Sequence, residues 1–337
     1  MVEELGNLNL QPCTEDRVQS KSEPIGSNFI TGFKGVAPNI RQLSRLSVSK
    51  GLCALVVDWT VIIGCFSLAI YFPHPMVWIA AALIIATRQH ALLILMHDAA
   101  HYRLLPSHVW NDRLSNWLFA WPLLVSTEGY RHNHLAHHRH LNTDDDPDWM
   151  RKDGKPDWMF PKSKREFGLL LIREFFGGGF FEVIRSITDL AGKKLNAAKN
   201  KSSNWGQMTY YLIAIAAISK GGLWLPVLLL WFLPAFTILT VILRIRSIAE
   251  HFGVEGGHDL NMSRNTHARL WERLLLAPHN SGYHLDHHLY PSVPFYHLRQ
   301  LHEMLQTVPD YATRSHQSES LLGLERSSML TEISNNK

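Results

Sequence analysis

Cysteine is scarce in this chain, with three among 337 residues. Cys13 lies in a polar stretch, whereas Cys53 and Cys65 lie in an apolar segment, where we expect small buried residues. Three cysteines without paired spacing do not favour the disulfide framework of a secreted protein. They also argue against an iron–sulfur cluster or a structural zinc site built from thiolates.

Dense runs of positive charge and phosphate-binding glycine loops are also missing. The formal net charge is +4, and no Lys/Arg run is dense enough to indicate nucleic-acid binding. The N-terminus has no positive region followed by an apolar core, so we expect no cleaved signal peptide. We expect a polar cytosolic tail over residues 1–48, a membrane domain over 49–309, and a polar C-terminal tail over 310–337 without a role in chemistry.

The apolar residues are concentrated in four runs that pair into two hairpins. The runs are Leu52–Phe72, Met76–Met96, Met208–Ser219 and Leu223–Leu243. Three of them reach about 20 residues, the length of a membrane-spanning helix, while Met208–Ser219 needs neighbouring residues to complete a span. The sequence therefore predicts an all-α integral membrane protein with two transmembrane hairpins, about four spans, and a helical cap on one side.

Two further apolar segments are interpreted as not crossing the bilayer. Leu114–Val125 has only about a dozen residues, so we expect it to be re-entrant or interfacial. Glu166–Leu190 mixes apolar positions with charges and is broken by glycines, which favours an interfacial segment or helices that cover the cap.

Loop charges predict the orientation. The turn at 73–75 carries no Lys or Arg and the turn at 220–222 carries only Lys220, whereas basic residues flank the opposite ends of the runs. These are Arg41, Arg45, Lys50, Arg103, Arg113, Arg131, Arg244 and Arg246. By the positive-inside rule, both termini and the cap are expected on the cytosolic side of a multi-pass membrane protein.

Histidine is the compositional outlier, with 20 residues, and eight of them form three clusters. The clusters are HDAAH with His97 and His101, HLAHH with His134, His137 and His138, and HLDHH with His284, His287 and His288. Residues spaced i, i+3 and i+4 project from one face of a helix, so each cluster could direct its imidazoles at a metal. Eight imidazoles exceed the needs of one metal, so two metals are implied.

Seven further histidines and the nearby acids are assigned outer roles. Seven histidines point off the common face or lack a partner at helical spacing, and we expect structural or supporting roles for His90, His132, His140, His267, His279, His297 and His302. Four acids follow the second cluster, namely Asp144, Asp145, Asp146 and Asp148. They either cap a helix or accept the second ring N–H of a ligand, and the sequence does not choose among them.

The three clusters, in this order and with two hairpins around them, resemble the histidine boxes of the integral-membrane fatty acid desaturase and hydroxylase family. The resemblance covers roughly residues 50 to 305. It implies a non-haem di-iron centre, O2 as co-substrate and two externally supplied electrons. The family often adds a histidine before the third box, and His251 matches that place. The implied ligands are His97, His101, His134, His137, His138, His251, His284, His287 and His288.

The same resemblance implies the reaction, with alternatives left open. We expect oxygen-dependent desaturation of a fatty acyl chain in a membrane lipid. HDAAH and DDDPD are also similar to carotenoid ketolases and hydroxylases, and oxygen rebound would make the enzyme an acyl hydroxylase. A different class, a non-catalytic His-rich metal transporter or store, is disfavoured because transporters place ligands near the bilayer midplane.

The expected partners follow from what the chain contains. No HPGG haem motif occurs, so electrons are expected from a separate ferredoxin, or a b-type cytochrome with its reductase. The acidic face of this electron donor would meet basic residues of the chain, which we expect to be Arg131, Lys162, Lys164 and Arg165. Asp58 and Arg88 interrupt the first two apolar runs at comparable depths, and we expect them to pair.

Overall fold

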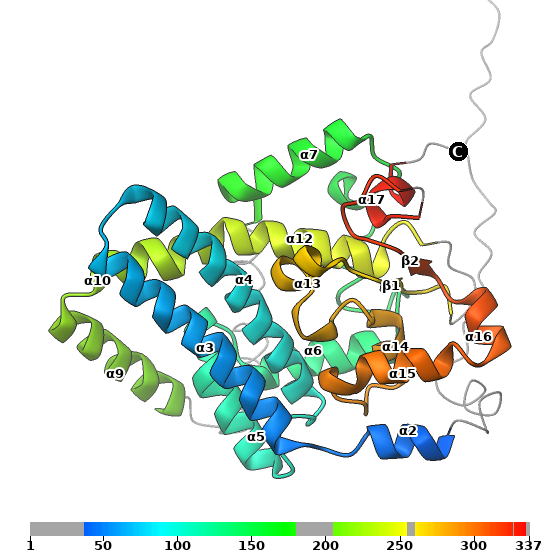
Figure 1. The fold of residues 1–337 in the computed structure, drawn as a ribbon, viewed down its shortest axis with the longest axis horizontal. Helices are drawn as coiled ribbons and strands as arrows, with labels where there is room; N and C mark the ends of the chain where they lie inside the picture. Colours follow the sequence, from blue (N-terminus) through cyan, green and yellow to red (C-terminus); the bar gives the residue numbers. More distant parts are fainter. Residues whose placement is uncertain (1–36, 180–204, 255–259, 326, 335–337) are drawn as a thin grey trace, which may run out of the picture.

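The computed structural model describes residues 37–179, 205–254, 260–325 and 327–334. These residues are mostly helical, and their one sheet is a parallel ladder of two-residue strands. Long helices lie at the left of Figure 1 and a cap of short helices lies at the right. The expected all-α class is thus confirmed in its coarse form.

The first predicted hairpin is confirmed as α3 (Val48–Tyr71) and α4 (Pro75–Ala100). Pro75 stands at the first position of α4, where its missing N–H costs nothing, and the His74 ring accepts a hydrogen bond from the Met76 amide. Most of α4 is buried, whereas α3 exposes a large part of its apolar surface. Cys53, expected to be buried, is exposed because it lies on this outer surface of α3.

The second hairpin consists of α9 and a composite helix. α9 spans Trp205–Gly221, so the short run extends by three residues at its start. The composite helix runs from Trp224 to His251 as α10 (Trp224–Val227), η5 (Leu228–Phe232), α11 (Leu233–Phe236) and α12 (Ile238–His251). Among the described residues, α3, α4 and this composite helix are long and apolar enough to cross a membrane. α9 has only 17 residues, so the structure supports a membrane protein without fixing four spans.

The apolar segment before the second histidine box folds as a broken series of short helices against α4. These are α5 (His108–Ser115), η1 (Asn116–Ala120) and η2 (Trp121–Leu123). The series ends at Leu124, whose φ is +63°. α6 (Thr127–Arg139) follows, capped by the Ser126 side chain, which accepts from the Gly129 amide. None of these pieces is one of the three candidate spans.

The predicted interfacial segment at 166–190 is described only as far as residue 179. The short helix η3 (Pro156–Trp158) precedes it, and the segment itself begins with α7 (Lys164–Arg173) and η4 (Glu174–Gly178). Ser163 and Glu166 form a capping box at the start of α7. Glu174 is buried, and its carboxylate accepts a hydrogen bond from Arg244 on α12 at 2.6 Å. The remainder of the predicted segment, residues 180–190, lies outside the described residues.

The cap is a set of short helices that follow α12 and one that precedes α3. They are α2 (Ala37–Leu43), α13 (Leu270–Leu275), η6 (Pro278–Asn280), α14 (His284–Leu289), η7 (Phe295–His297) and α15 (Leu298–Leu305). The third histidine box forms α14, which packs against α15 and strand β1 (Asn265–Thr266). The cap thus holds α14 in place against the ends of the long helices (Figure 1).

The C-terminal segment differs from the polar tail expected at 310–337. It contains α16 (Pro309–Arg314), β2 (Gln317–Ser318), which pairs with β1, and α17 (Met329–Glu332). Tyr311, Met329 and Ile333 are completely buried. Sparse apolar residues in a polar segment are enough to pack because the surrounding cap supplies the rest of the core. Of the expected N-terminal tail, residues 1–36 lie outside the described residues.

The predicted pair between Asp58 and Arg88 is confirmed. Arg88 Nη1 donates to Asp58 Oδ1 at 3.1 Å, and Asp58 is completely buried. The structure adds a third partner that was not predicted. His279 Nε2 lies 2.7 Å from the other carboxylate oxygen of Asp58. Arg88 Nη2 also donates to the Leu274 carbonyl at 2.6 Å. This network therefore ties α3 and α4 to the cap.

Replacing Asp58 by Asn is expected to destabilise the protein by about 3–5 kcal/mol, because it leaves Arg88 in a buried site without its counter-charge. Thermal unfolding in detergent measures the effect, with the exposed Asp144→Asn as the matched control. Adding Arg88→Met should recover part of the loss, since neighbouring charges couple. Equal stability of Asp58→Asn and the control would contradict the pairing.

Candidate metal centre

All nine histidines named as ligand candidates come together, in two adjacent groups. The first group contains His97, His101, His134, His138 and His287, and the second contains His137, His251, His284 and His288. Within each group, one ring nitrogen of every residue lies within 4.8 Å of the others. Each group gathers side chains from three separate helices, and so could hold one metal ion. The first two boxes both contribute to the first group. The two ends of the segment that joins them therefore lie at the same site.

Helix geometry explains how the boxes are divided between the groups. Successive residues are rotated by about 100° around the helix axis. Relative to position i, position i+4 is therefore rotated by about 40° in one direction and position i+3 by about 60° in the other. On α6, His134 and His138 therefore face the first group and His137 faces the second. On α14 the assignment is reversed, with His284 and His288 in the second group and His287 in the first.

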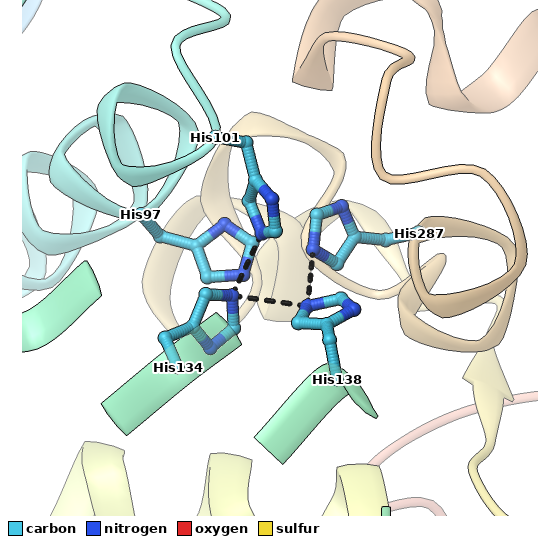
Figure 2. A group of neighbouring side chains, drawn as sticks. All are labelled: His97, His101, His134, His138 and His287. Carbon is cyan, nitrogen blue, oxygen red and sulfur yellow. Dashed lines mark hydrogen bonds between the residues drawn. The ribbon is translucent and has the colours of Figure 1, made fainter. Parts of the chain in front are cut away.

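Ring nitrogens in each group point at a common centre. Figure 2 shows the first group, where His134 Nε2 lies 2.8 Å from His101 Nε2 and 3.0 Å from His138 Nε2. In the second group, His284 Nε2 lies 2.9 Å from His251 Nε2 and 3.1 Å from His288 Nε2. The groups also touch, since the rings of His138 and His288 stack with centroids 4.1 Å apart.

Burial favours the neutral form of six of these imidazoles by lowering their pKa values. Burial, with a smaller effect of the Arg103 and Arg131 guanidinium groups, lowers the pKa of His101 to about 3. Burial likewise holds the pKa values of His134, His138, His284, His287 and His288 well below the usual range, and neighbouring histidines reinforce this. A neutral imidazole offers the lone pair that a metal requires, so these rings are ready to coordinate at neutral pH.

The donor set fits a pair of transition-metal ions. Buried polar atoms normally have a hydrogen-bond partner, yet His97 Nε2 is buried and has none among the described residues. Nitrogens that converge at about 3 Å satisfy one another poorly, because each contact needs one donor and one acceptor. Neutral imidazoles suit iron, zinc, copper and nickel, and a metal in each group would use the lone pairs that the protein leaves unmatched.

Three acids lie next to the outer sides of the rings, and one of them is within hydrogen-bond distance of a ring nitrogen. Among the four acids after the second box, Asp146 is the one that contacts a candidate ligand, with Oδ2 2.8 Å from His137 Nδ1. Glu250 Oε1 lies 3.4 Å from His284 Nδ1, and Asp98 Oδ1 lies 3.7 Å from His97 Nδ1. Sequence reasoning missed Glu250 and Asp98. The available signal was adjacency, since Glu250 precedes His251 and Asp98 follows His97.

A buried network behind α14 holds the third box. Asp286 lies between the box histidines and is completely buried. Its carboxylate accepts from the Asn265 amide at 2.9 Å and from the Tyr311 hydroxyl, and lies 2.8 Å from His302 Nδ1. The C-terminal segment supplies Tyr311, so it contributes to positioning the third box. Sequence reasoning had no signal for this contact, because Tyr311 is 25 residues away.

Arg131 does not have the role expected for it. It is 9% exposed, so its assignment to a docking surface was wrong. Its guanidinium donates to the Ala99 and Ala100 carbonyls at 3.0 and 2.8 Å, and to Asp112 at 2.9 Å. Arg131 therefore satisfies the carbonyls at the end of α4, next to His101, because a cation is favoured at a helix C-terminus.

The seven histidines for which structural or supporting roles were expected lie outside both groups. His302 and His279 bind Asp286 and Asp58, His297 Nδ1 lies 2.8 Å from the Leu43 carbonyl oxygen, and His267 Nε2 lies 2.8 Å from the Gln317 amide oxygen. His132 is exposed on α6, and His90 is buried in α4.

Comparisons with known proteins agree with the site. The chain is 28% identical over 285 residues to a dihydrorhizobitoxine desaturase of Bradyrhizobium elkanii, covering 81% of this chain and 80% of the relative. It is 26% identical over 238 residues to a beta-carotene ketolase of Paracoccus sp. (strain N81106 / MBIC 01143), covering 67% of this chain and 79% of the relative. A second beta-carotene ketolase, from Paracoccus sp. (strain PC1), is 25% identical over 263 residues, covering 74% and 90%.

The family comparison covers most of the chain. The sequence model described as "Fatty acid desaturase" matches residues 73–319, which include all three histidine boxes and His251. This match, together with relatives that are a desaturase and ketolases, indicates an enzyme and argues against a non-catalytic metal transporter or store. The chain therefore belongs to the fatty acid desaturase family and is an oxidoreductase.

Proposed function

We propose that the nine histidines bind two iron ions, five at one and four at the other, in a non-haem di-iron centre. The observation that carries this proposal is the convergence of nine imidazoles into two touching groups. When bound, such a centre supplies, with O2, an oxidant strong enough for an unactivated C–H bond. The chain itself contributes neutral ligands, fixed ring orientations and a site largely buried from water.

The reaction we propose is desaturation of a fatty acyl chain in a membrane lipid. One methylene pair loses two hydrogen atoms, and O2 takes these with two electrons and two protons to give two water molecules. Support comes from the apolar helices around the site, which suit a lipid-soluble substrate, and from the desaturase among the relatives. Asp146 holds the ring orientation of His137, and placement of the reacting carbon depends on such fixed rings.

A second candidate is oxygenation of a carotenoid, and a third is acyl hydroxylation. The carotenoid candidate is supported by the two beta-carotene ketolases among the relatives. The same centre could serve all three reactions, since the outcome depends on which carbon lies nearest the oxidant and on whether a second hydrogen is removed.

The electrons are proposed to come from a separate ferredoxin, or from a b-type cytochrome with its reductase. We place the metal centre and both termini on the cytosolic side, because the turns at the far ends of the hairpins carry few basic residues. Of the basic residues named for docking, Lys164 and Arg165 are exposed at the start of α7 and Lys162 is partly exposed. These three remain available to an acidic donor.

Feeding isotopically labelled fatty acids to a strain that expresses the chain with a reductase system tests the reaction. We expect a labelled acyl chain with one new double bond, and no such product from a strain with the empty vector. The same cells, given a carotenoid-producing background, report on the alternative. New keto- or hydroxy-carotenoids with an unchanged acyl profile would replace the proposal, and a hydroxylated acyl chain without a new double bond would overturn the reaction while keeping the site.

A further inference from the structure

We propose that a cavity between α4, α11 and α12 binds an amphiphile with an acyl chain and an anionic head group, and that Lys155 and Trp158 hold the anion. The inference rests on the proposed function, in which this amphiphile is the substrate. It adds a requirement that the reaction does not impose, namely a negative charge on the lipid. A carotene has no such charge, so the cavity also bears on the choice between the candidate substrates.

The inner part of the cavity suits an acyl chain. Its volume is about 550 Å³, within the range of small-molecule sites. Its apolar wall includes Leu93, Leu123, Trp231, Phe236, Leu239 and Leu243. Leu93 lies one helical turn before His97 on α4, and Ser247, also in the lining, lies one turn before His251 on α12. The cavity therefore approaches the helix ends that carry both groups of histidines.

Among the described residues, the charged lining of the cavity is more positive than negative. Its charged lining residues are Asp148, Arg151, Lys152, Lys155, Glu174 and Arg244. Glu174 pairs with Arg244 at 2.6 Å, while Asp148 is shared by Arg151 at 2.9 Å and by Lys152. Lys155 forms no ion pair within the part of the chain that the structure describes. Within the described lining, Lys155 is the cation that no carboxylate pairs, so it is available to an anion.

A buried donor strengthens the case for an anion. Trp158 lines the cavity and is 7% exposed, yet its Nε1–H has no hydrogen-bond partner among the described residues. Lys152 Nζ and the Arg244 guanidinium lie over its ring at 4.8 and 3.9 Å, so two cations contact the indole. A buried donor without an acceptor is costly, and a carboxylate or phosphate oxygen bound here would supply the acceptor.

Lipid binding to the purified full-length protein in a non-ionic detergent tests the proposal without turnover. The probes are radiolabelled stearate, its uncharged methyl ester, a phosphatidic acid and beta-carotene. We expect the protein to bind an anionic probe at least about 10-fold more tightly than the ester. Lys155→Gln should weaken anion binding roughly 2–5-fold, the effect of one partly solvated ion pair, and leave ester binding unchanged. Trp158→Phe should weaken anion binding further by removing the donor while keeping a ring.

The matched control is Lys220→Gln, which removes the same charge from the exposed last turn of α9 and should change no affinity. Tighter binding of stearate than of phosphatidic acid would identify a free carboxylate as the anion, and the reverse order would identify a phosphate head group. Equal binding of acid and ester, or equal affinities of Lys155→Gln and Lys220→Gln for the anionic probes, would overturn the inference even in an enzyme that desaturates lipids. Selective anion binding by a protein that makes no double bond would keep the inference and reject the proposed reaction.

Discussion

Replacing His137 by Ala is expected to abolish activity, by more than about 100-fold, and to reduce the iron content from about two ions per chain to about one. His137 is one of the four candidate ligands that the described residues place in its group, and its Nδ1 lies 2.8 Å from the buried Asp146. The Ala variant loses a ligand and leaves that carboxylate without its partner. Because the change lies on α6, which is not one of the three candidate spans, the protein should still insert into membranes.

The measurements are metal content by mass spectrometry and product formation per mole of protein. His132→Ala is the matched control, since His132 lies on the same helix but is exposed and belongs to neither group. It should keep both irons and its activity. His287→Ala should behave like His137→Ala, because it removes a ligand from the first group. Stoichiometric zinc in protein that is active without iron would reject the di-iron assignment.

Replacing Asp146 by Asn is expected to lower activity or metal affinity about 10–100-fold, the usual range for a residue that orients a metal-binding histidine. Asp146 is completely buried, and its carboxylate also accepts hydrogen bonds from the backbone N–H groups of Asn142 and Asp148 at 3.1 and 2.8 Å. These bonds fix the carboxylate, so it can hold His137 in one ring orientation. An amide in its place can still fill the space but no longer provides two acceptor oxygens.

Asp145→Asn separates this effect from a general loss of negative charge in the DDDPD stretch. Asp145 is exposed, one residue away, and should tolerate the change. A chelator titration of the iron-loaded variants measures how tightly each holds its metal, independently of turnover. Similar iron retention in the two variants, together with similar activity, would show that Asp146 has no part in orienting His137.

Periodic features of the sequence were sufficient for much of the fold and for the set of candidate ligands. The apolar runs predicted the α3 and α4 hairpin within a few residues, because a span must be long and continuously apolar. The i, i+3, i+4 spacing identified eight of the nine histidines, and the family resemblance added His251. The pair between Asp58 and Arg88 was also predictable, since charges within apolar helices need partners.

Local patterns failed where a contact joins segments far apart in the chain. Tyr311 reaches Asp286 from a segment that reads as a polar tail, and Arg131 reads as a surface cation although it binds the carbonyls at the end of α4. Neither contact has a signature in its own neighbourhood. His279 carried no helical spacing either, and only the packing of the cap against α4 brings it to Asp58.

The sequence by itself determined the set of candidate metal ligands, because helical spacing and apolar length are properties of short segments. Only the tertiary structure decided how nine histidines divide into groups of five and four, and which of four neighbouring acids supports a ring. The physical reason is that the division depends on the angles at which α4, α6, α12 and α14 meet. Those angles are set by packing among the helices and the cap, including the C-terminal segment behind α14.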